Sequence, residues 1–513
     1  MKHRRKVIAG IGCLLLATLI GYPKLFNIKA ISSESQYSEP KTIEVIVQKR
    51  QGSDSLSLLQ SVGGILVAET PIINGFVAKL PADSLDKFGK QEGVLRYSIS
   101  HPIGMTGDFG RKIKIGEGNQ FKRPEKLDND YREIVEADAV REKGKGVTIA
   151  VLDSGVGSDS FSKTSLNVVR SMAINPNATT ANDLYGHGTH VAGIINGKGQ
   201  QAVTGIAPEA KLINVKLGDD QGNLTEIDLL FGLQWVFDFK DDYKIKVVNL
   251  SVSSDTAGSY IDSPLSAAVE QLWLSGVTVV AAAGNDRINP TDIDYAPAND
   301  PYIITVGAVD GKGQEKAKES ELAYWSKHGV TAEGVHKPEV TAPGVDIISL
   351  LSEQDATLAI EHPEAVINKN YFEMSGTSMA APMVSGTVAL MLEANPSLTP
   401  NEIKSILLGT DVPYKNMSDG AGVINAKRAV EIAKDKRKLA ELPKYDNTWP
   451  LSSYMLDTGT MFDWAKASWG SIDWTKASWG YADWAKASWG YIDWTKASWG
   501  NVDWAKASWG YVE

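Results

Sequence analysis

A serine set among small residues is the first candidate for chemistry in this sequence. Ser378 lies in the small-residue run Glu373–Pro382, and a strongly helical segment follows it. A helix start offers free backbone N–H groups, and small neighbours allow another chain to approach closely. A nucleophile whose substrate develops an oxyanion has these requirements. Ser378 is therefore the candidate nucleophile.

Two histidines three residues apart form the second candidate. His187 and His190 lie in the segment Gly-His-Gly-Thr-His-Val-Ala-Gly, residues 186–193. A metal site is one interpretation of such a pair. However, no Glu lies between them, and no other His, Cys or Glu falls at close ligand spacing. The flanking glycines favour close packing instead, with one histidine as a base and the other in a structural role.

Single polar residues that follow apolar strands complete the set. Asp153 follows the apolar run Val147–Leu152, and the carboxyl end of a parallel strand is where α/β sheets place their sites. Asn285 follows a second apolar run and Gly284. Taken alone, either residue could be a cap or turn residue. Asn285 could also donate to an oxyanion.

Taken together, these motifs resemble the subtilase (subtilisin-like serine protease) family over about residues 130–433. The matching motifs are Val-Leu-Asp-Ser-Gly around Asp153, Gly-His-Gly-Thr-His-Val-Ala-Gly around His187, and Gly-Thr-Ser-Met-Ala-Ala-Pro around Ser378. The resemblance implies that Ser378 attacks a peptide carbonyl, His187 transfers the proton and Asp153 orients the imidazole. It also implies that the Asn285 side chain and the Ser378 N–H hold the oxyanion. The alternative is an inactive relative, but none of these residues is missing.

The resemblance also implies a substrate-binding strand at Ser251, Val252 and Ser253. In the family, such a strand pairs with an extended peptide through its backbone. Ser253 and Ser254 stand where many members have glycine, and side chains there could narrow or polarise the pocket for the residue before the scissile bond, so a preference for large apolar side chains is not assumed.

No cofactor is expected for catalysis, and no metal ligand is identified. The segment Ile194–Val203 lacks the carboxylates that calcium prefers and carries Lys198, so the family's tight calcium site is expected to be absent. Structural calcium elsewhere stays open. The single cysteine, Cys13, excludes an intramolecular disulfide and a cysteine-based metal site.

The fold class predicted for residues 130–433 is α/β, a parallel sheet with helices on both faces. Continuous apolar strands alternate there with helical patterns. Residues 41–103 show the order β-α-β-β-α-β of a ferredoxin-like fold and are similar to the family's inhibitory propeptide of the inhibitor-I9 type. An independent small domain is the alternative. Residues 104–145 are expected to be exposed, with a short helix around 133–141, and propeptide cleavage is expected between His101 and Lys145.

The composition of the chain ends predicts their roles. Residues 1–30 are predicted to be a signal peptide, because four basic residues precede the 15-residue apolar run Val7–Gly21. Lipid attachment at Cys13 is the less favoured interpretation. Residues 434–460 are predicted to be a linker. Residues 461–513 form a low-complexity tail in which a ten-residue unit with two tryptophans occurs five times.

Two functions from different classes follow. One is a secreted, extracellular, self-processing serine endopeptidase whose partners are protein or peptide substrates and its own propeptide, an intramolecular inhibitor. The other is an adhesive protein in which the tryptophan repeats bind cell-wall glycans or each other and retain the chain at the cell envelope. A tail with no partner is equally open. The formal net charge of −10 argues against nucleic acid as a partner.

Overall fold

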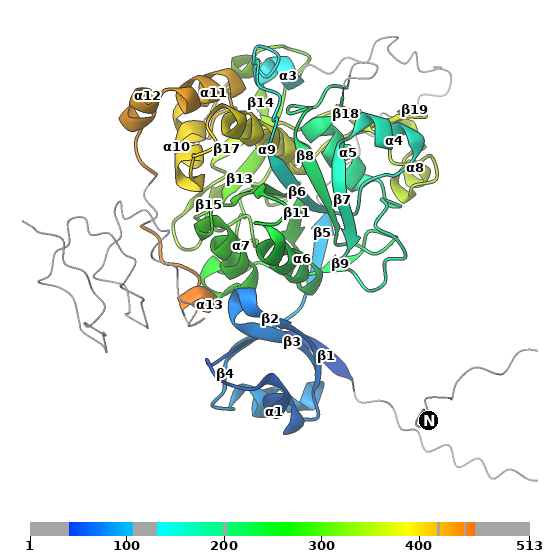
Figure 1. Ribbon diagram of the computed structural model, residues 1–513, viewed down its shortest axis with the longest axis vertical. Coiled ribbons are helices and arrows are strands. Elements are labelled where there is room, and N and C mark those ends of the chain that lie inside the picture. Colours follow the sequence, from blue (N-terminus) through cyan, green and yellow to red (C-terminus); the bar gives the residue numbers. More distant parts are fainter. Residues whose placement is uncertain (1–40, 106–130, 199–202, 418–420, 446–447, 457–513) are drawn as a thin grey trace, which may run out of the picture. The chain divides into compact units, whose positions relative to one another are not determined.

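The computed structural model describes residues 41–105, 131–198, 203–417, 421–445 and 448–456 (Figure 1). The predicted signal peptide (1–30) and the tryptophan repeats (461–513) lie outside the described residues. Within the described part, no helix is both long and apolar enough to cross a membrane.

The centre of the fold is an eight-stranded sheet. Its order is β14-β13-β12-β10-β6-β8-β7, with β17 also paired to β13, and all pairs are parallel except β13–β14. The strands are β6 (Thr148–Asp153), β7 (Val168–Ala173), β8 (Lys211–Lys216), β10 (Ile245–Leu250), β12 (Thr278–Ala282), β13 (Ile304–Asp310), β14 (Glu321–Leu322) and β17 (Val340–Pro343). The predicted parallel α/β sheet is confirmed, because the strands found from apolar runs are buried on both faces.

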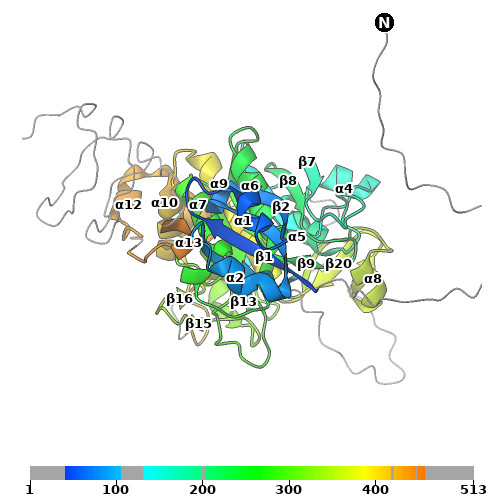
Figure 2. The same cartoon turned by 90° about the horizontal axis from the view of Figure 1, so that it is seen from below.

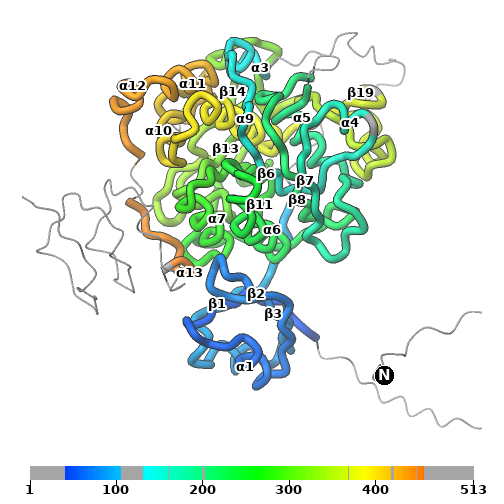
Figure 3. The backbone as a smooth tube through the Cα atoms, viewed as in Figure 1, coloured from blue at the N-terminus to red at the C-terminus, as the bar shows by residue number. Residues whose placement is uncertain are grey.

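Helices cover both faces of this sheet (Figure 1). On one face α9 (Thr377–Ala394) crosses β10, β12, β13 and β17, and it packs against α5 (His187–Asn196) and α11 (Ala426–Lys434). On the other face α6 (Glu226–Phe239) and α7 (Pro264–Leu274) pack together. The tube in Figure 3 shows that α5 and α9, far apart in the sequence, lie side by side.

Capping residues explain where several helices begin. Thr225 and Asp228 form a capping box at the start of α6, and Thr399 and Glu402 form one at the start of α10 (Pro400–Thr410). The remaining elements are α4 (Ser160–Ser165), α8 (Thr357–Glu361), β15 (Gly329–Val330), β16 (His336–Lys337), β18 (Ile347–Leu350), β19 (Val366–Asn368) and β20 (Tyr371–Met374).

Residues 42–99 form a second, four-stranded antiparallel sheet with the order β2-β3-β1-β4, which is the ferredoxin-like order. Its strands are β1 (Thr42–Lys49), β2 (Ile65–Thr70), β3 (Gly75–Pro81) and β4 (Val94–Ile99), and its helices are α1 (Ser55–Gln60) and α2 (Leu85–Gly89) (Figure 2). Alternation along the strands gives the sheet two apolar faces. One face packs with Leu58, Leu59 and Phe88 of the two helices.

The other face of this small sheet joins the main core. Ile46, Ile73 and Val77 belong to the same buried cluster as the apolar residues of α6 and α7. The backbone N–H of Ile72 also donates to Gln234 Oε1 of α6 at 2.7 Å. The small domain therefore buries apolar surface against the helices that cover one face of the large sheet.

A strand that the sequence analysis did not predict follows this domain. β5 (Pro102–Met105) is the middle strand of a three-stranded sheet between β9 (Leu224–Thr225) and β11 (Val252–Ser254). The helix expected around 133–141 is wrong in position and length, since α3 covers only Tyr131–Ile134 and Glu136 adopts a left-handed φ of 53°. That conformation ends an α-helix of L-residues.

The linker prediction for 434–460 is wrong where the structure describes it. α12 (Lys436–Glu441) extends the helical part, and α13 (Ser453–Leu456) packs against α7. The backbone N–H of Ser452 donates to both carboxylate oxygens of buried Glu270, at 2.9 and 3.0 Å. The Arg96 guanidinium of β4 lies 5.3 Å from the Tyr454 ring, so this segment contacts both the small domain and the main core.

Candidate active site

Asp153 and His187 form a buried pair at the carboxyl end of the parallel sheet. Asp153 is the last residue of β6 and His187 the first residue of α5. The His187 Nδ1 lies 2.6 Å from Asp153 Oδ1, and each side chain is only 1% exposed. A carboxylate at Nδ1 fixes the imidazole so that Nε2 is the nitrogen available for proton transfer.

Glycine makes this close approach possible. A Cβ at Gly188 would lie 2.2 Å from the carbonyl oxygen of Gly155 and 3.0 Å from Asp153 Cβ. Any side chain at position 188 would therefore push the first turn of α5 away from β6. The sequence-based expectation that the glycines around the histidines serve close packing is confirmed.

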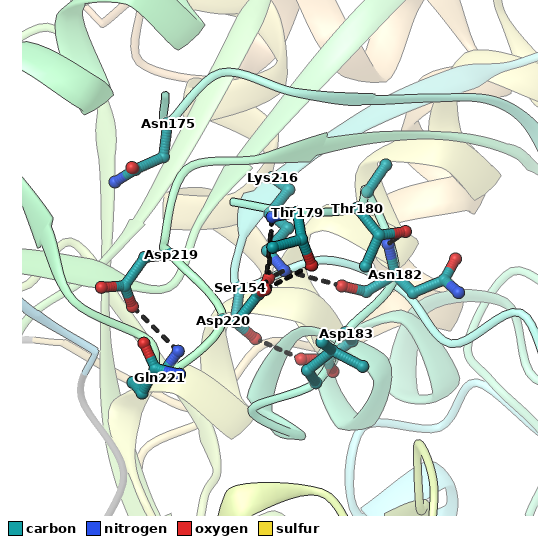
Figure 4. Close-up of polar contacts among 12 residues, drawn as sticks. Ser154, Asn175, Thr179, Thr180, Asn182, Asp183, Lys216, Asp219, Asp220 and Gln221 are labelled. Carbon is teal, nitrogen blue, oxygen red and sulfur yellow. Dashed lines mark hydrogen bonds and ion pairs between the residues drawn. The ribbon is translucent and has the colours of Figure 1, made fainter. Parts of the chain in front are cut away.

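A buried carboxylate that the sequence analysis missed organises this corner (Figure 4). Asp183 accepts hydrogen bonds from Ser154 Oγ (2.8 Å), Gly186 N (2.7 Å), Thr189 N (2.8 Å) and Thr189 Oγ1 (2.6 Å). Burial raises the pKa of Asp183 although these four donors oppose that shift. By bonding Ser154, next to Asp153, and the first turn of α5, Asp183 sets how the two catalytic candidates face each other.

A buried lysine holds the loop that carries Asp183 (Figure 4). Lys216, the last residue of β8, donates to the carbonyl oxygen of Asn182 at 2.9 Å and pairs with Asp220 at 2.8 Å. Burial opposes the ionised form of Asp220, but Lys216 and Thr179 hold its pKa below the usual range. The ion pair therefore ties residues 179–183 to the end of the sheet.

His190 has a structural position, as expected. Its Nε2 lies 3.1 Å from the carbonyl oxygens of both Ile347 and Phe372. Two acceptors require that Nε2 carries the proton. Burial lowers the pKa of His190 to about 3, with the nearby His187 adding to the shift, so the ring is neutral.

Ser378 is the second residue of α9 and is buried. Its Oγ donates to the carbonyl oxygen of Ser251 at 3.1 Å, and its own carbonyl accepts from Ser251 Oγ at 3.0 Å. In a regular helix that carbonyl would accept from residue 382, but Pro382 has no N–H. The proline thus frees the Ser378 carbonyl for Ser251, which joins the helix start to the strand beside it.

Asn285 lies next to the same helix start. Its Oδ1 accepts from Thr377 N at 3.0 Å and from Thr377 Oγ1 at 2.9 Å. Because Oδ1 faces these donors, Nδ2 points the other way, and in the described part of the chain this buried atom has no hydrogen-bond partner. A buried N–H without an acceptor is costly, and an oxyanion at this place would satisfy it.

Of the residues predicted to bind substrate, Val252 and Ser253 lie in a strand that already has a partner, and Ser251 directly precedes it. β11 pairs antiparallel with β5, so that Val252 lies opposite Met105, Ser253 opposite Gly104, and Ser254 opposite Ile103. On its other edge β5 pairs with β9, with Ile103 opposite Leu224. β9 and β11 are therefore spaced to hold one extended segment between them.

No group of metal-ligating side chains that could hold an ion occurs among the residues that the structure describes. Part of the loop where the family's calcium site was considered, residues 199–202, lies outside them.

Comparison with known proteins gives a consistent match. The subtilase family model matches residues 144–433. The serine protease AprX of Bacillus subtilis (strain 168) is 35% identical over 300 residues, which cover 56% of this chain and 66% of that protein, just under two thirds of its length. Subtilisin E of the same strain is 28% identical over 429 residues, covering 82% of this chain and 98% of that protein.

A solved structure supports the fold. Fervidolysin from Fervidobacterium pennivorans, a keratinolytic enzyme related to subtilisin, superposes with a TM-score of 0.58 at 23% identity. The match covers 78% of this chain and 62% of fervidolysin.

Proposed function

Since the chain belongs to the subtilase family and is a serine endopeptidase, we propose that Ser378, His187 and Asp153 are its catalytic residues. The observation that carries this proposal is the 2.6 Å bond between His187 Nδ1 and Asp153 Oδ1, at the sheet edge where Ser378 also lies. Ser378 Oγ attacks the peptide carbonyl carbon, and its proton passes to His187 Nε2. That proton then goes to the leaving amine as the C–N bond breaks.

The charge that develops on the carbonyl oxygen is held by two donors in this proposal. One is Asn285 Nδ2, which is already oriented by Thr377. The other is the Ser378 backbone N–H at the start of α9. Water then attacks the acyl-enzyme with His187 as base, and Ser378 Oγ regains its proton. No cofactor takes part in these steps.

Residues 41–103 act in this proposal as an intramolecular inhibitor of a zymogen. The support is that β5 fills the place between β9 and β11, where an extended substrate would pair. The carbonyl oxygen of Ser251 accepts a hydrogen bond from Ser378 Oγ, so Ser251 marks the position of the nucleophile along the strand. The next residue, Val252, lies opposite Met105. If this register continues by one residue, Thr106 lies opposite Ser251. Ser378 would then attack the carbonyl of Thr106 and cleave the bond between Thr106 and Gly107. Thr106 and Gly107 lie outside the described residues, so the assignment rests on the register alone.

Secretion is proposed from the basic and apolar N-terminal pattern. A cell-envelope role of the tryptophan repeats stays a prediction.

The test is expression of the chain with and without Ser378→Ala in a protease-deficient host, followed by N-terminal sequencing of the product. We expect the parent to lose its N-terminal segment and to begin at Gly107, and the alanine variant to keep that segment. Equal processing of both proteins, with no peptidase activity in the parent, would refute the proposed roles. A mature N-terminus elsewhere would refute only the register argument.

A further inference from the structure

A lysine lies directly beside the oxyanion donor, where no catalytic step uses it. The backbone N–H of Lys327 donates to the carbonyl oxygen of Gly284 at 3.0 Å, and Gly284 precedes Asn285. A Cβ at Gly284 would meet Lys327 Cδ at 3.1 Å and Ser253 Oγ at 3.5 Å. The Lys327 side chain therefore runs between the segment Gly284–Asn285, called here the oxyanion loop, and the strand β11 that would pair with substrate.

The ammonium of Lys327 lies over an aromatic ring in a buried position. The residue is 5% exposed, and Nζ lies 3.1 Å from the centroid of the Tyr295 ring. In the described residues no carboxylate forms an ion pair with it. Burial lowers the pKa of Lys327, while Asp292, Asp286 and Asp255 oppose that shift from longer range. A cation–π contact alone leaves a buried ammonium able to accept a carboxylate.

Three nearby carboxylates act on this ammonium from longer range, and none of them forms an ion pair with it among the described residues. Asp292 accepts a hydrogen bond from the Tyr295 hydroxyl at 3.1 Å. Asp286 accepts hydrogen bonds from the backbone N–H groups of Ile288 and Asn289. Asp255 is exposed. Solvent and salt screen an exposed charge much more than a buried one. Because none of the three reaches Nζ, a substrate carboxylate that contacts the buried ammonium directly would gain a hydrogen bond that they leave open.

Strand alternation shows which substrate side chain meets the lysine. In β5, Ile103 is buried and Met105 packs on the same core, with Met105 Cε 3.0 Å from a Cβ built at Gly218. Gly104 faces the opposite side, where its Cβ would lie 3.1 Å from Asp255 Oδ1. Side chains two residues apart share a face. The substrate residue whose carbonyl is attacked would lie opposite Ser251, two positions after the place of Gly104. Its side chain therefore points to the same side as Gly104, where Ser253, Asp255 and Lys327 lie.

We propose that Lys327 is a specificity-determining residue that selects a carboxylate side chain, glutamate or aspartate, in the substrate residue whose carbonyl carbon Ser378 attacks. This inference rests on the proposed function and concerns separate substrate molecules; the processing bond after Thr106 is cut within one chain, where tethering takes the place of side-chain selection. Tyr295 holds the ammonium by its cation–π contact, and Ser253 places a hydroxyl beside Gly284 and Lys327. The carboxylate gains a charge-assisted hydrogen bond that its amide analogue lacks.

The test compares three tetrapeptide anilides that differ only in the residue before the scissile bond: Glu, Gln or Phe. The full-length protein is expressed and allowed to process, and kcat/KM is measured for each peptide. We expect the parent to prefer Glu over Gln by about tenfold or more, as a charged hydrogen bond allows. Lys327→Met should bring that ratio to about one, chiefly through KM, because the pairing is made before the transition state.

Two further variants separate this role from a structural one. Lys327→Arg keeps the charge and should keep the preference for Glu. Lys318→Met removes an exposed positive charge elsewhere and should leave the ratio unchanged. If Lys327→Met fails to mature, the ratio of kcat/KM for the Glu and Gln peptides in Lys327→Arg decides, and loss of the Glu preference in that variant overturns the inference. Faster cleavage of the Phe or Gln peptide by the parent, or an unchanged ratio in Lys327→Met, overturns the inference. If the parent cleaves none of the peptides or casein, the proposed function itself fails.

Discussion

The hydroxyl of Thr377 is expected to act on catalysis only through Asn285. It donates to Asn285 Oδ1 at 2.9 Å and accepts the Gly284 N–H at 3.1 Å. Thr377→Val keeps the side-chain shape and the backbone bond to Oδ1 at 3.0 Å but removes the hydroxyl. One such bond is worth about 0.5–1.5 kcal/mol net. At about 1.4 kcal/mol per factor of ten, kcat should fall roughly 2- to 12-fold with little change in KM.

A graded series tests this reasoning. Asn285→Ala removes the donor itself and should lower kcat by about 10² to 10³, the loss that follows removal of the corresponding donor in subtilisin. Thr377→Ser keeps a hydroxyl and should stay near the parent. In the double variant, Thr377→Val should add almost nothing to Asn285→Ala, because the group that it orients is gone.

The assay is steady-state kinetics of the processed enzymes on one peptide anilide. Thr377→Val also leaves the buried Gly284 N–H without its acceptor, which should cost about 1–3 kcal/mol of stability. Unfolding is therefore measured in parallel, in a Ser378→Ala background that prevents autolysis. A kcat loss in Thr377→Val equal to that of Asn285→Ala, or the same Thr377→Val factor in the absence of Asn285, would refute the positioning role.

Two further predictions concern packing and charge. Gly188→Ala should abolish peptidase activity and self-processing, because its Cβ would lie 2.2 Å from the Gly155 carbonyl oxygen; processing seen by gel at the parent rate would contradict this. Glu339→Gln should lower the free energy of unfolding by about 3–5 kcal/mol in urea titrations, since its carboxylate lies 2.7 and 2.8 Å from the buried ammoniums of Lys337 and Lys404. Burial would raise the pKa of Glu339, but Lys337 and Lys404 hold it below the usual range of a glutamate. The contribution of Glu339 to the free energy of unfolding is therefore complete above the pKa that it has in the unfolded chain, and it is lost as pH falls through its pKa in the folded protein. A difference in unfolding free energy between parent and variant that grows on acidification would contradict this.

Local sequence determined the strands of the large sheet and the choice of candidate reacting groups in this protein. Apolar runs predicted the buried parallel strands because both faces of such strands are covered. Short motifs singled out Asp153, His187 and Ser378 as catalytic candidates, because strand ends and helix starts are where such groups can reach a substrate. The glycine at 188 signalled close packing before any partner was known.

Only the tertiary structure decided what surrounds these groups. Asp183 has no motif of its own, and its role exists because Ser154 and the first turn of α5 meet at one carboxylate. β5 is too short for its own sequence to predict a strand. It is a strand because it pairs with β9 and β11, which are more than a hundred residues away. The segment around Ser452 resembled a linker because part of its docking depends on the backbone, as in the bond from Ser452 N–H to Glu270, which composition does not reveal. Lys327 reaches the oxyanion loop through a strand register and a turn, and long-range geometry of that kind is not encoded in any local pattern.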